Sequence, residues 1–205
     1  MLCTLEYEET LFERGFVSIC GVDEVGRGCL AGPVLAAAVR LPRGFLLPGI
    51  NDSKKLTPVK REKLFSEITE NPEIAWAVAE IDAGGIDRMN ILQASREAMR
   101  MAVLGLFPAA DAALVDGLPF APFPVHQLAV VEGDAKSQSI AAASVVAKVT
   151  RDRIMLDYDL KYPEYGFKLH KGYATPQHQE SLRRLGPCEI HRRSFAPVRQ
   201  LSFDF

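Results

Sequence analysis

The sequence predicts an α/β fold with a mixed central sheet flanked by helices. Three apolar, partly β-branched segments occur in the first 80 residues, which is typical of strands. Two more short apolar segments follow, and segments with helical spacing alternate with them. The length of 205 residues suits one domain with a small C-terminal appendage.

The strands are expected at the short apolar runs. They cover residues 16–22, 34–40, 74–80, 112–117 and 128–134. A glycine-rich turn joins the first two, and the last two each run directly into a carboxylate.

Four helices are expected. Thr57 and Thr175 are each followed by proline, the pattern of an N-cap with proline at the first helical position, so a helix begins after each. Gly186 ends the second of these. Apolar spacing predicts a long helix over 86–106, and another over about 138–160 has an alanine-rich start that would allow close packing on a sheet.

Composition indicates a cytoplasmic globular protein without a membrane span. Hydrophobic residues make up 48% and charged residues 24% of the chain. No stretch approaches the ~20 apolar residues that cross a bilayer, and the acidic N-terminus is unlike a signal peptide. The 4 cysteines form no CxxC pair, so we expect free thiols and no structural zinc.

Charge is divided unevenly along the chain. Residues 1–134 carry a net charge of −7 and residues 135–205 one of +5, which together give the −2 of the whole chain. An acidic body with a basic C-terminal third suits a protein whose carboxylates hold metal while another surface meets phosphate. The alternative is that solvated faces simply differ in charge.

Carboxylates occur where three of the expected strands end. Asp23 and Glu24 end the first, Asp116 ends the fourth and Asp134 follows the fifth. Crowded carboxylates repel one another, and a hard cation removes that conflict. Mg²⁺ and Mn²⁺ prefer oxygen ligands, and no cysteine or histidine lies at these ends, which argues against zinc. Each aspartate could merely start a turn or cap a helix, but three such strand ends favour a metal site.

The loop Gly26-Arg27-Gly28 follows the first pair of carboxylates. Two glycines would let a backbone approach a ligand closely, and arginine supplies donors that match phosphate. Glycines also form ordinary turns, so the signal is weak alone. The chain has neither a Walker A loop nor GxGxxG, which makes a nucleotide-binding α/β protein a poor alternative.

Six motifs in order resemble the signature of ribonuclease HII, the bacterial type 2 ribonuclease H. They are DEVGRG, NDSKKL, LVDG, EGDAKSQSIAAASVVAKVTRDR, YGFKLHKGYATPQH and HRRSFAPV, within residues 16–199. The resemblance implies a ribonuclease H-like fold, with a five-stranded mixed sheet and flanking helices. It implies a catalytic domain over 1–160 and a small C-terminal substrate-binding helical region over 161–205.

The resemblance also assigns roles to residues. It implies that four carboxylates are catalytic and bind Mg²⁺ or Mn²⁺: Asp23, Glu24, Asp116 and Asp134. It implies that five residues bind substrate: Gly26, Arg27 and Gly28, which read a ribose 2′-hydroxyl, Lys54, which contacts phosphate, and Tyr173, which packs on the sugar beside the scissile phosphate. Asp152 is a weaker candidate: in mid-helix between two arginines, it could be only a salt-bridged surface residue, and it is left out of the metal set.

The implied activity is endonucleolytic. The enzyme would hydrolyse the RNA strand of RNA/DNA hybrids and cut 5′ to single ribonucleotides in duplex DNA by two-metal catalysis, leaving 3′-hydroxyl and 5′-phosphate ends. We expect a monomer that acts on these duplexes and not at a membrane. The rival classes are a junction resolvase or integrase-like nuclease of the same fold and a non-catalytic duplex-binding module.

Other residues carry weaker expectations. The arginines near the C-terminus could follow a DNA backbone or form a solvated basic face: Arg183, Arg184, Arg192 and Arg193. His170 and His191 are expected to be structural or to lie near phosphate, Trp76 to lie in the core, and residues 137–144 to pack helix on sheet. Tyr173 could instead be a core residue that caps the last helix.

Overall fold

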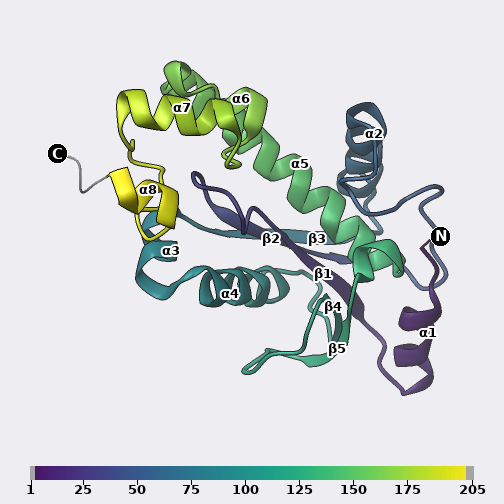
Figure 1. The fold of residues 1–205 in the computed structure, drawn as a ribbon. Coiled ribbons are helices and arrows are strands. Elements are labelled where there is room, and N and C mark those ends of the chain that lie inside the picture. The colour runs from purple at the N-terminus through teal and green to yellow at the C-terminus, as the bar shows by residue number, and fades with distance from the viewer. Residues whose placement is uncertain (1–2, 202–205) are drawn as a thin grey trace.

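The computed structural model describes residues 3–201 and contains one five-stranded sheet (Figure 1). Its strands are β1 (Ile19–Val25), β2 (Val34–Arg40), β3 (Ala75–Ile81), β4 (Ala112–Asp116) and β5 (His126–Val130), in the order β3-β2-β1-β4-β5. Pairing is antiparallel between β1, β2 and β3 and parallel between β1, β4 and β5. The mixed α/β sheet predicted from the sequence is therefore confirmed.

Helices cover both faces of the sheet. In Figure 1, α5 (Gln138–Lys161) and α2 (Pro58–Thr69) lie on one side, and α4 (Ile91–Leu104) and α3 (Ala83–Met89) lie on the other. The alanine-rich start of α5 packs very closely, because a Cβ on Gly21 of β1 would lie 2.0 Å from the Ser139 carbonyl carbon. The close packing expected for residues 137–144 is thus confirmed, and α5 contacts the middle of the sheet directly.

The remaining helices lie at the two ends of the fold. Near the N-terminus, α1 (Glu6–Glu13) packs beside β4 and the start of α5. Beyond α5 follow four short helical segments, grouped together in Figure 1: η2 (Pro163–Tyr165), α6 (Phe167–His170), α7 (Pro176–Leu185) and α8 (Ala196–Leu201). They share buried contacts with Leu30, Ala31 and Met155, so this region is packed onto the body of the protein.

Two strands differ from the sequence expectation by more than one residue at an end. The first strand covers 19–25 instead of 16–22, because pairing with β2 continues through Asp23 and Glu24. Backbone hydrogen bonding is indifferent to side-chain charge, so two carboxylates do not end the strand. The fifth strand covers 126–130 instead of 128–134, because the left-handed backbone at Glu132, with φ 55°, turns the chain into a short 3₁₀ helix that carries Asp134.

The helix expected over 86–106 is two helices. Asn90 separates α3 from α4 with φ 67°, a left-handed conformation that asparagine tolerates better than most residues. Its side chain accepts a hydrogen bond from the Gln93 N–H and so caps α4. Apolar spacing identifies most of the buried face of α4, with Leu92 an exception at 42% exposed, but it does not show this break. The caps predicted at Thr57 and Thr175 are confirmed, since each side chain accepts an N–H bond from the first turn of its helix.

Three composition-based expectations can also be compared with the structure. The prediction that Trp76 lies in the core is wrong: it is 39% exposed on β3, one of the two edge strands of the sheet. The cysteines are free thiols, as expected. Within residues 3–201, no helix combines the length and apolar character that a bilayer crossing requires.

Candidate active site

Two of the predicted site carboxylates are neighbours in the sheet. Strands β1 and β4 run parallel with Val22 opposite Val115, so the next residues, Asp23 and Asp116, lie side by side. Both follow the alternation that faces α5. The parallel pairing therefore joins residues that are far apart in the sequence.

Asp134 joins this pair through the turn that precedes α5. The Gly133 N–H donates to Asp116 Oδ1 at 2.7 Å, which fastens the turn to the end of β4. A Cβ on Gly133 would lie 2.5 Å from the Ile140 side chain and 3.3 Å from Asp116 Oδ1. Only glycine fits at this position. The close approach of Gly133 brings the next residue, Asp134, to the same edge of the sheet.

Glu24 points to the opposite face of the sheet. Its Oε1 atom accepts a hydrogen bond from Arg27 Nη1 at 3.2 Å. Together with Asp116 it lines a cavity of about 270 Å³ on the α4 side. The four carboxylates thus surround the end of β1 from both faces.

The electrostatics of these carboxylates show crowding. Burial, and then the charges of Glu24 and Asp116, raise the pKa of Asp23 well above its ordinary value. Burial also raises the pKa of Glu24 and of Asp116, although hydrogen bonds from Arg27 and Gly133 oppose it. Burial, and then the charge of Asp52, raise the pKa of Asp134 to about 6. Negative charge is therefore costly here unless a cation joins it.

The donor atoms suit a hard divalent cation, because all four side chains offer carboxylate oxygen. Among residues 3–201, however, no three His, Cys, Asp or Glu side chains are already gathered around one point. Several carboxylates make local hydrogen bonds instead, and Asp23 Oδ1 accepts the Glu24 N–H at 2.7 Å. Cation binding would then require these side chains to turn toward a shared ion.

Lys54 connects the carboxylates to a basic groove. Burial would lower its pKa, but Asp23, Asp52 and Asp134 outweigh that effect and leave the pKa raised. The ammonium group therefore stays charged beside the carboxylates. Such a cation can neutralise an incoming phosphate next to the acidic cluster.

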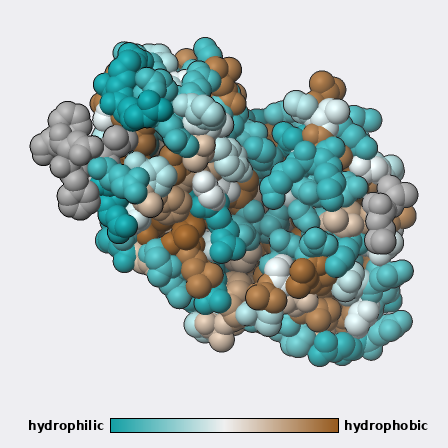
Figure 2. Space-filling model, viewed as in Figure 1, coloured by the Kyte–Doolittle hydropathy of each residue, from teal (hydrophilic) through white to brown (hydrophobic). Residues whose placement is uncertain are grey.

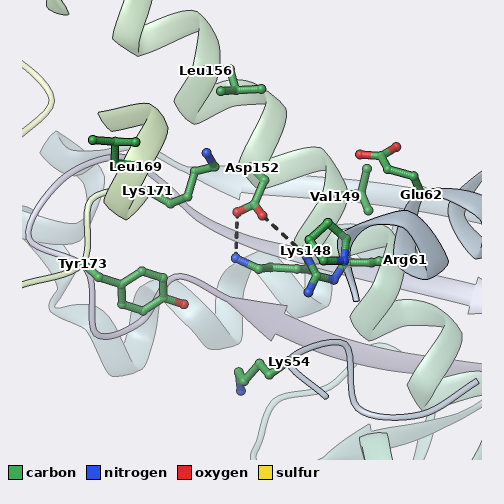
Figure 3. A pocket seen from close by; sticks show the side chains of 11 residues that line it. Lys54, Arg61, Glu62, Lys148, Val149, Asp152, Leu156, Leu169, Lys171 and Tyr173 are labelled. Carbon is green, nitrogen blue, oxygen red and sulfur yellow. Dashed lines mark hydrogen bonds and ion pairs between the residues drawn. The ribbon is translucent and has the colours of Figure 1, made fainter. Parts of the chain in front are cut away.

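The groove is a hollow of about 680 Å³ between α2, α5 and the segment that follows α6 (Figure 3). Figure 2 shows the corresponding depression between the C-terminal helices and α2. Four cations and two carboxylates line it: Lys54, Arg61, Lys148, Lys171, Glu62 and Asp152. It is therefore an open channel with an excess of positive charge.

Asp152 belongs to the groove and not to the carboxylate cluster. It pairs with Lys148 at 2.7 Å and lies 4.0 Å from Arg61 (Figure 3). The arginines next to it in sequence bond to other groups. A salt bridge was expected, but its partners come from one turn earlier in α5 and from α2.

The two glycines of the 26–28 loop differ in the space around them. Gly26 has φ +91°, and a Cβ there would lie 2.3 Å from Arg151 Nε. Gly28 has open space where its Cβ would be. Gly26 is thus required by the protein's own packing, whereas Gly28 leaves its backbone uncovered on the outside.

Tyr173 lies beside this loop. Cys29 and Tyr173 form an antiparallel bridge, and the Leu30 N–H donates to the Gly172 carbonyl at 2.8 Å. The half-buried ring faces the groove, with Lys148 Nζ 5.8 Å from its centroid (Figure 3). The structure therefore brings the loop and the tyrosine together, as a shared role requires.

The expectation for Arg192 is wrong. It was placed on a DNA-facing or solvated surface, but it is fully buried and donates to backbone carbonyls. Arg183 and Arg193 are exposed, as expected for either alternative. His170 and His191 are buried, which agrees with a structural role.

Sequence reasoning missed Glu8. This carboxylate of α1 is 4% exposed, and its Oε1 atom accepts from Ser137 Oγ at 2.6 Å and from the Ser139 N–H at 2.9 Å. It thereby fastens α1 to the start of α5, next to the turn that carries Asp134. No local pattern marks it, because its partners lie about 130 residues away.

Comparisons with known proteins agree with this geometry. The family model for ribonuclease HII matches residues 20–198. The chain is 51% identical over 195 residues to ribonuclease HII of Syntrophomonas wolfei, covering 95% of this chain and 76% of that protein. It is 50% identical over 196 residues to ribonuclease HII of Geotalea uraniireducens, covering 96% and 90%. The crystal structure of ribonuclease H2 from Pyrococcus horikoshii OT3 superposes with a TM-score of 0.76 at 28% identity, covering 92% of this chain and 98% of that one. The chain therefore belongs to the ribonuclease HII family and is a ribonuclease H enzyme.

Proposed function

We propose that this enzyme hydrolyses the RNA strand of RNA/DNA hybrids and cuts 5′ to single ribonucleotides embedded in duplex DNA. The products would carry 3′-hydroxyl and 5′-phosphate ends. The observation that carries the proposal is the position of a cluster of carboxylates, Asp23 buried and the others half-buried, at the end of β1 and β4, between the 26–28 loop and the basic groove.

The carboxylates would hold Mg²⁺ or Mn²⁺. The four ligands are Asp23, Glu24, Asp116 and Asp134, and their all-oxygen donor set fits either ion. When bound, two such ions supply an activated water and neutralise the charge on the phosphate and on the leaving oxygen. The crowding that raises the pKa of Asp23 supports this, since a cation would relieve it.

The basic groove would hold the sugar-phosphate backbone. Lys54 stands nearest the carboxylates, and Lys148 and Lys171 extend the positive surface beyond Tyr173. Contacts of this kind position a duplex without reading its sequence. The enzyme would therefore accept many base sequences and weaken in binding as salt rises.

Recognition of the ribose would fall to the 26–28 loop and Tyr173. The uncovered backbone at Gly28 can approach a 2′-hydroxyl, the group that distinguishes RNA from DNA. Arg27 would add a phosphate contact. The ring of Tyr173 would pack on the next sugar, where a deoxyribose fits better than a ribose, and so would place the scissile phosphate over the carboxylates.

The two rival classes predict different substrates. A junction resolvase or integrase-like nuclease would cut all-DNA duplexes, and a duplex-binding module would cut nothing. The 26–28 loop beside Tyr173 favours a ribonuclease over the first, and the presence of all four carboxylates favours an enzyme over the second. We also expect the active species to be a monomer in the cytoplasm.

The decisive experiment is a time course on three duplexes of one sequence: one with a single ribonucleotide, one with a complete RNA strand and one with DNA only. Each is incubated with Mg²⁺, with Mn²⁺ or with a chelator, and the product ends are mapped. We expect metal-dependent cuts 5′ to the single ribonucleotide and throughout the RNA strand. Cutting of the all-DNA duplex, or equal cutting in chelator, would contradict the proposal.

A further inference from the structure

Two adjacent buried residues, His191 and Arg192, are attached to the two proposed recognition elements. They are 1% and 0% exposed. Their backbone runs alongside the chain that follows the 26–28 loop: the Gly32 N–H donates to Ile190 O at 2.9 Å, and the Arg192 N–H donates to Leu30 O at 2.9 Å. From this segment the two side chains reach different partners.

The side chain of His191 reaches Tyr173 through a second histidine. His178 Nδ1 lies 2.9 Å from the Tyr173 carbonyl, which can only accept, so this nitrogen carries the hydrogen. Burial lowers the pKa of His178 to about 4, and the neutral ring therefore offers Nε2 as an acceptor. His191 Nε2, 3.1 Å away, is then the donor.

The other nitrogen of His191 completes the chain of hydrogen bonds. Its Nδ1 atom accepts from the Cys188 N–H at 3.0 Å and lies 3.1 Å from the Cys188 thiol. Every bond from Cys188 through His191 and His178 to Tyr173 thus runs in one direction. Each ring has a single tautomer that satisfies its neighbours, so the chain defines where the Tyr173 backbone lies.

The side chain of Arg192 reaches the loop. Its Nη1 atom donates to the Arg27 carbonyl at 2.9 Å, and its Nε atom donates to the Gly32 carbonyl at 3.0 Å. Within residues 3–201 it makes no ion pair, and Nη2 is buried without a hydrogen-bond partner. A buried guanidinium is costly, and its bonds to the Arg27 and Gly32 carbonyls, with the Phe195 ring centroid 5.1 Å from its Cζ atom, offset that cost.

We propose that His191 and Arg192 are positioning residues that set the distance between the 26–28 loop and the ring of Tyr173. This inference rests on the proposed function, in which the loop reads the ribose and the ring packs on the next sugar. Successive sugars have a fixed spacing, so both contacts form together only at one separation of the two elements. The pair would therefore govern the selection of a single ribonucleotide followed by deoxyribose.

A complete RNA strand depends less on that separation. Every sugar in it is a ribose, on which the ring of Tyr173 would pack less well than on a deoxyribose, so a displaced ring removes less of the binding. A duplex with one ribonucleotide presents a deoxyribose to the ring and depends on both contacts. Loosening the segment at His191 or Arg192 should then reduce single-ribonucleotide cleavage more than hybrid cleavage.

The test measures kcat and KM for both duplexes in paired variants. His191→Leu removes the donor to His178, whereas the amide of His191→Gln can replace it. Arg192→Met removes the side-chain bonds to the Arg27 and Gly32 carbonyls, whereas Arg192→Lys keeps the charge and one donor group. Val103→Ala, a buried change in α4 on the opposite face of the sheet, is the control for lost stability.

We expect His191→Leu and Arg192→Met to lower kcat on the single-ribonucleotide duplex about tenfold more than on the hybrid, the scale of a small misplacement of reacting groups. His191→Gln should recover most of the difference, and Val103→Ala should leave the ratio unchanged. If His191→Leu or Arg192→Met does not fold, Arg192→Lys decides: its single amine cannot replace both guanidinium bonds, so the ratio of kcat on the two duplexes should shift part of the way, and an unchanged ratio overturns the proposal. Equal losses on both duplexes also overturn it. A wild-type enzyme that ignores the single ribonucleotide refutes the proposed function instead.

Discussion

The side chain of Arg151 occupies the space that a side chain at Gly26 would need. A Cβ on Gly26 would lie 2.3 Å from Arg151 Nε, and the guanidinium of Arg151 is itself held by the carbonyls of Pro33, Ala31 and Lys171. Gly28, two residues on, faces open space. The loop therefore has one glycine that serves the fold and one that is free to serve a ligand.

Substitutions at these two glycines should separate stability from activity. Gly26→Ala should lower the melting temperature by several degrees, because the left-handed backbone and the Arg151 contact both resist a side chain, at a cost of about 1–3 kcal/mol. Gly28→Val should melt like the wild type but cut the single-ribonucleotide duplex slowly. Thermal melts and cleavage rates of both variants measure this. Wild-type rates in a folded Gly28→Val protein would exclude the role assigned to the loop.

The carboxylates should be essential for cleavage but not for folding. Asp23→Asn, Asp116→Asn and Asp134→Asn should each lose most activity, while removal of a crowded charge should leave the melting temperature of the metal-free protein unchanged or higher. Cleavage in Mg²⁺ and melting in chelator are the two measurements. Near wild-type rates in any two of these variants would show that the metal assignment is wrong.

Metal binding should depend on the protonation of Asp134. Its pKa is raised to about 6, so in the metal-free protein the native state holds this proton longer than the unfolded chain does. That contribution to stability is present at low pH and is lost as the pH rises toward about 6. A cation competes with the same proton, so the rise in melting temperature caused by Mg²⁺ or Mn²⁺ should grow as the pH increases through about 6.

The control for this prediction is Asp134→Asn. Its melting temperature should lack that part of the pH dependence and should respond weakly to either ion. Other groups titrate nearby, so the informative quantity is the difference between the wild type and this variant at each pH. A metal-induced shift that is the same at pH 5 and pH 8 would contradict the role given to Asp134.

Tyr173 should matter for cleavage more than for stability. Tyr173→Ala should weaken transition-state stabilisation on the single-ribonucleotide duplex by roughly 1–3 kcal/mol, the range for a lost aromatic contact with a nucleotide. Tyr173→Phe should keep most activity if the ring alone packs on the sugar. Both kcat/KM and the melting temperature are measured. A large fall in melting temperature for Tyr173→Ala would favour the alternative that the ring is a core residue.

The positive charge of the basic groove should make the binding of duplex substrates depend on salt concentration. Lys148→Ala should raise KM on every duplex, because the lost cation contacts phosphate and not a base. The slope of log KM against log salt should become shallower by about 1. Lys63→Ala, on the exposed side of α2, is the matched control and should change neither quantity. An unchanged slope in Lys148→Ala would place the substrate outside the groove.

Much of the site could be predicted from the sequence because its signals are local. The carboxylates follow apolar runs, and the caps at Thr57 and Thr175 use residue types that favour those positions in any fold. The order of the motifs predicted the family, which the comparisons confirm. The division at residue 160 stays a prediction.

Only the tertiary structure decided which residues meet. The parallel pairing of β1 with β4 puts Asp23 beside Asp116, and no local pattern specifies that register. Arg192 could not be distinguished from its exposed neighbours, because its burial depends on carbonyls more than 150 residues away. Side-chain type and spacing determine what a segment prefers, whereas burial and long-range hydrogen bonds, which arise only when the chain packs, determine which face each residue presents and what it contacts.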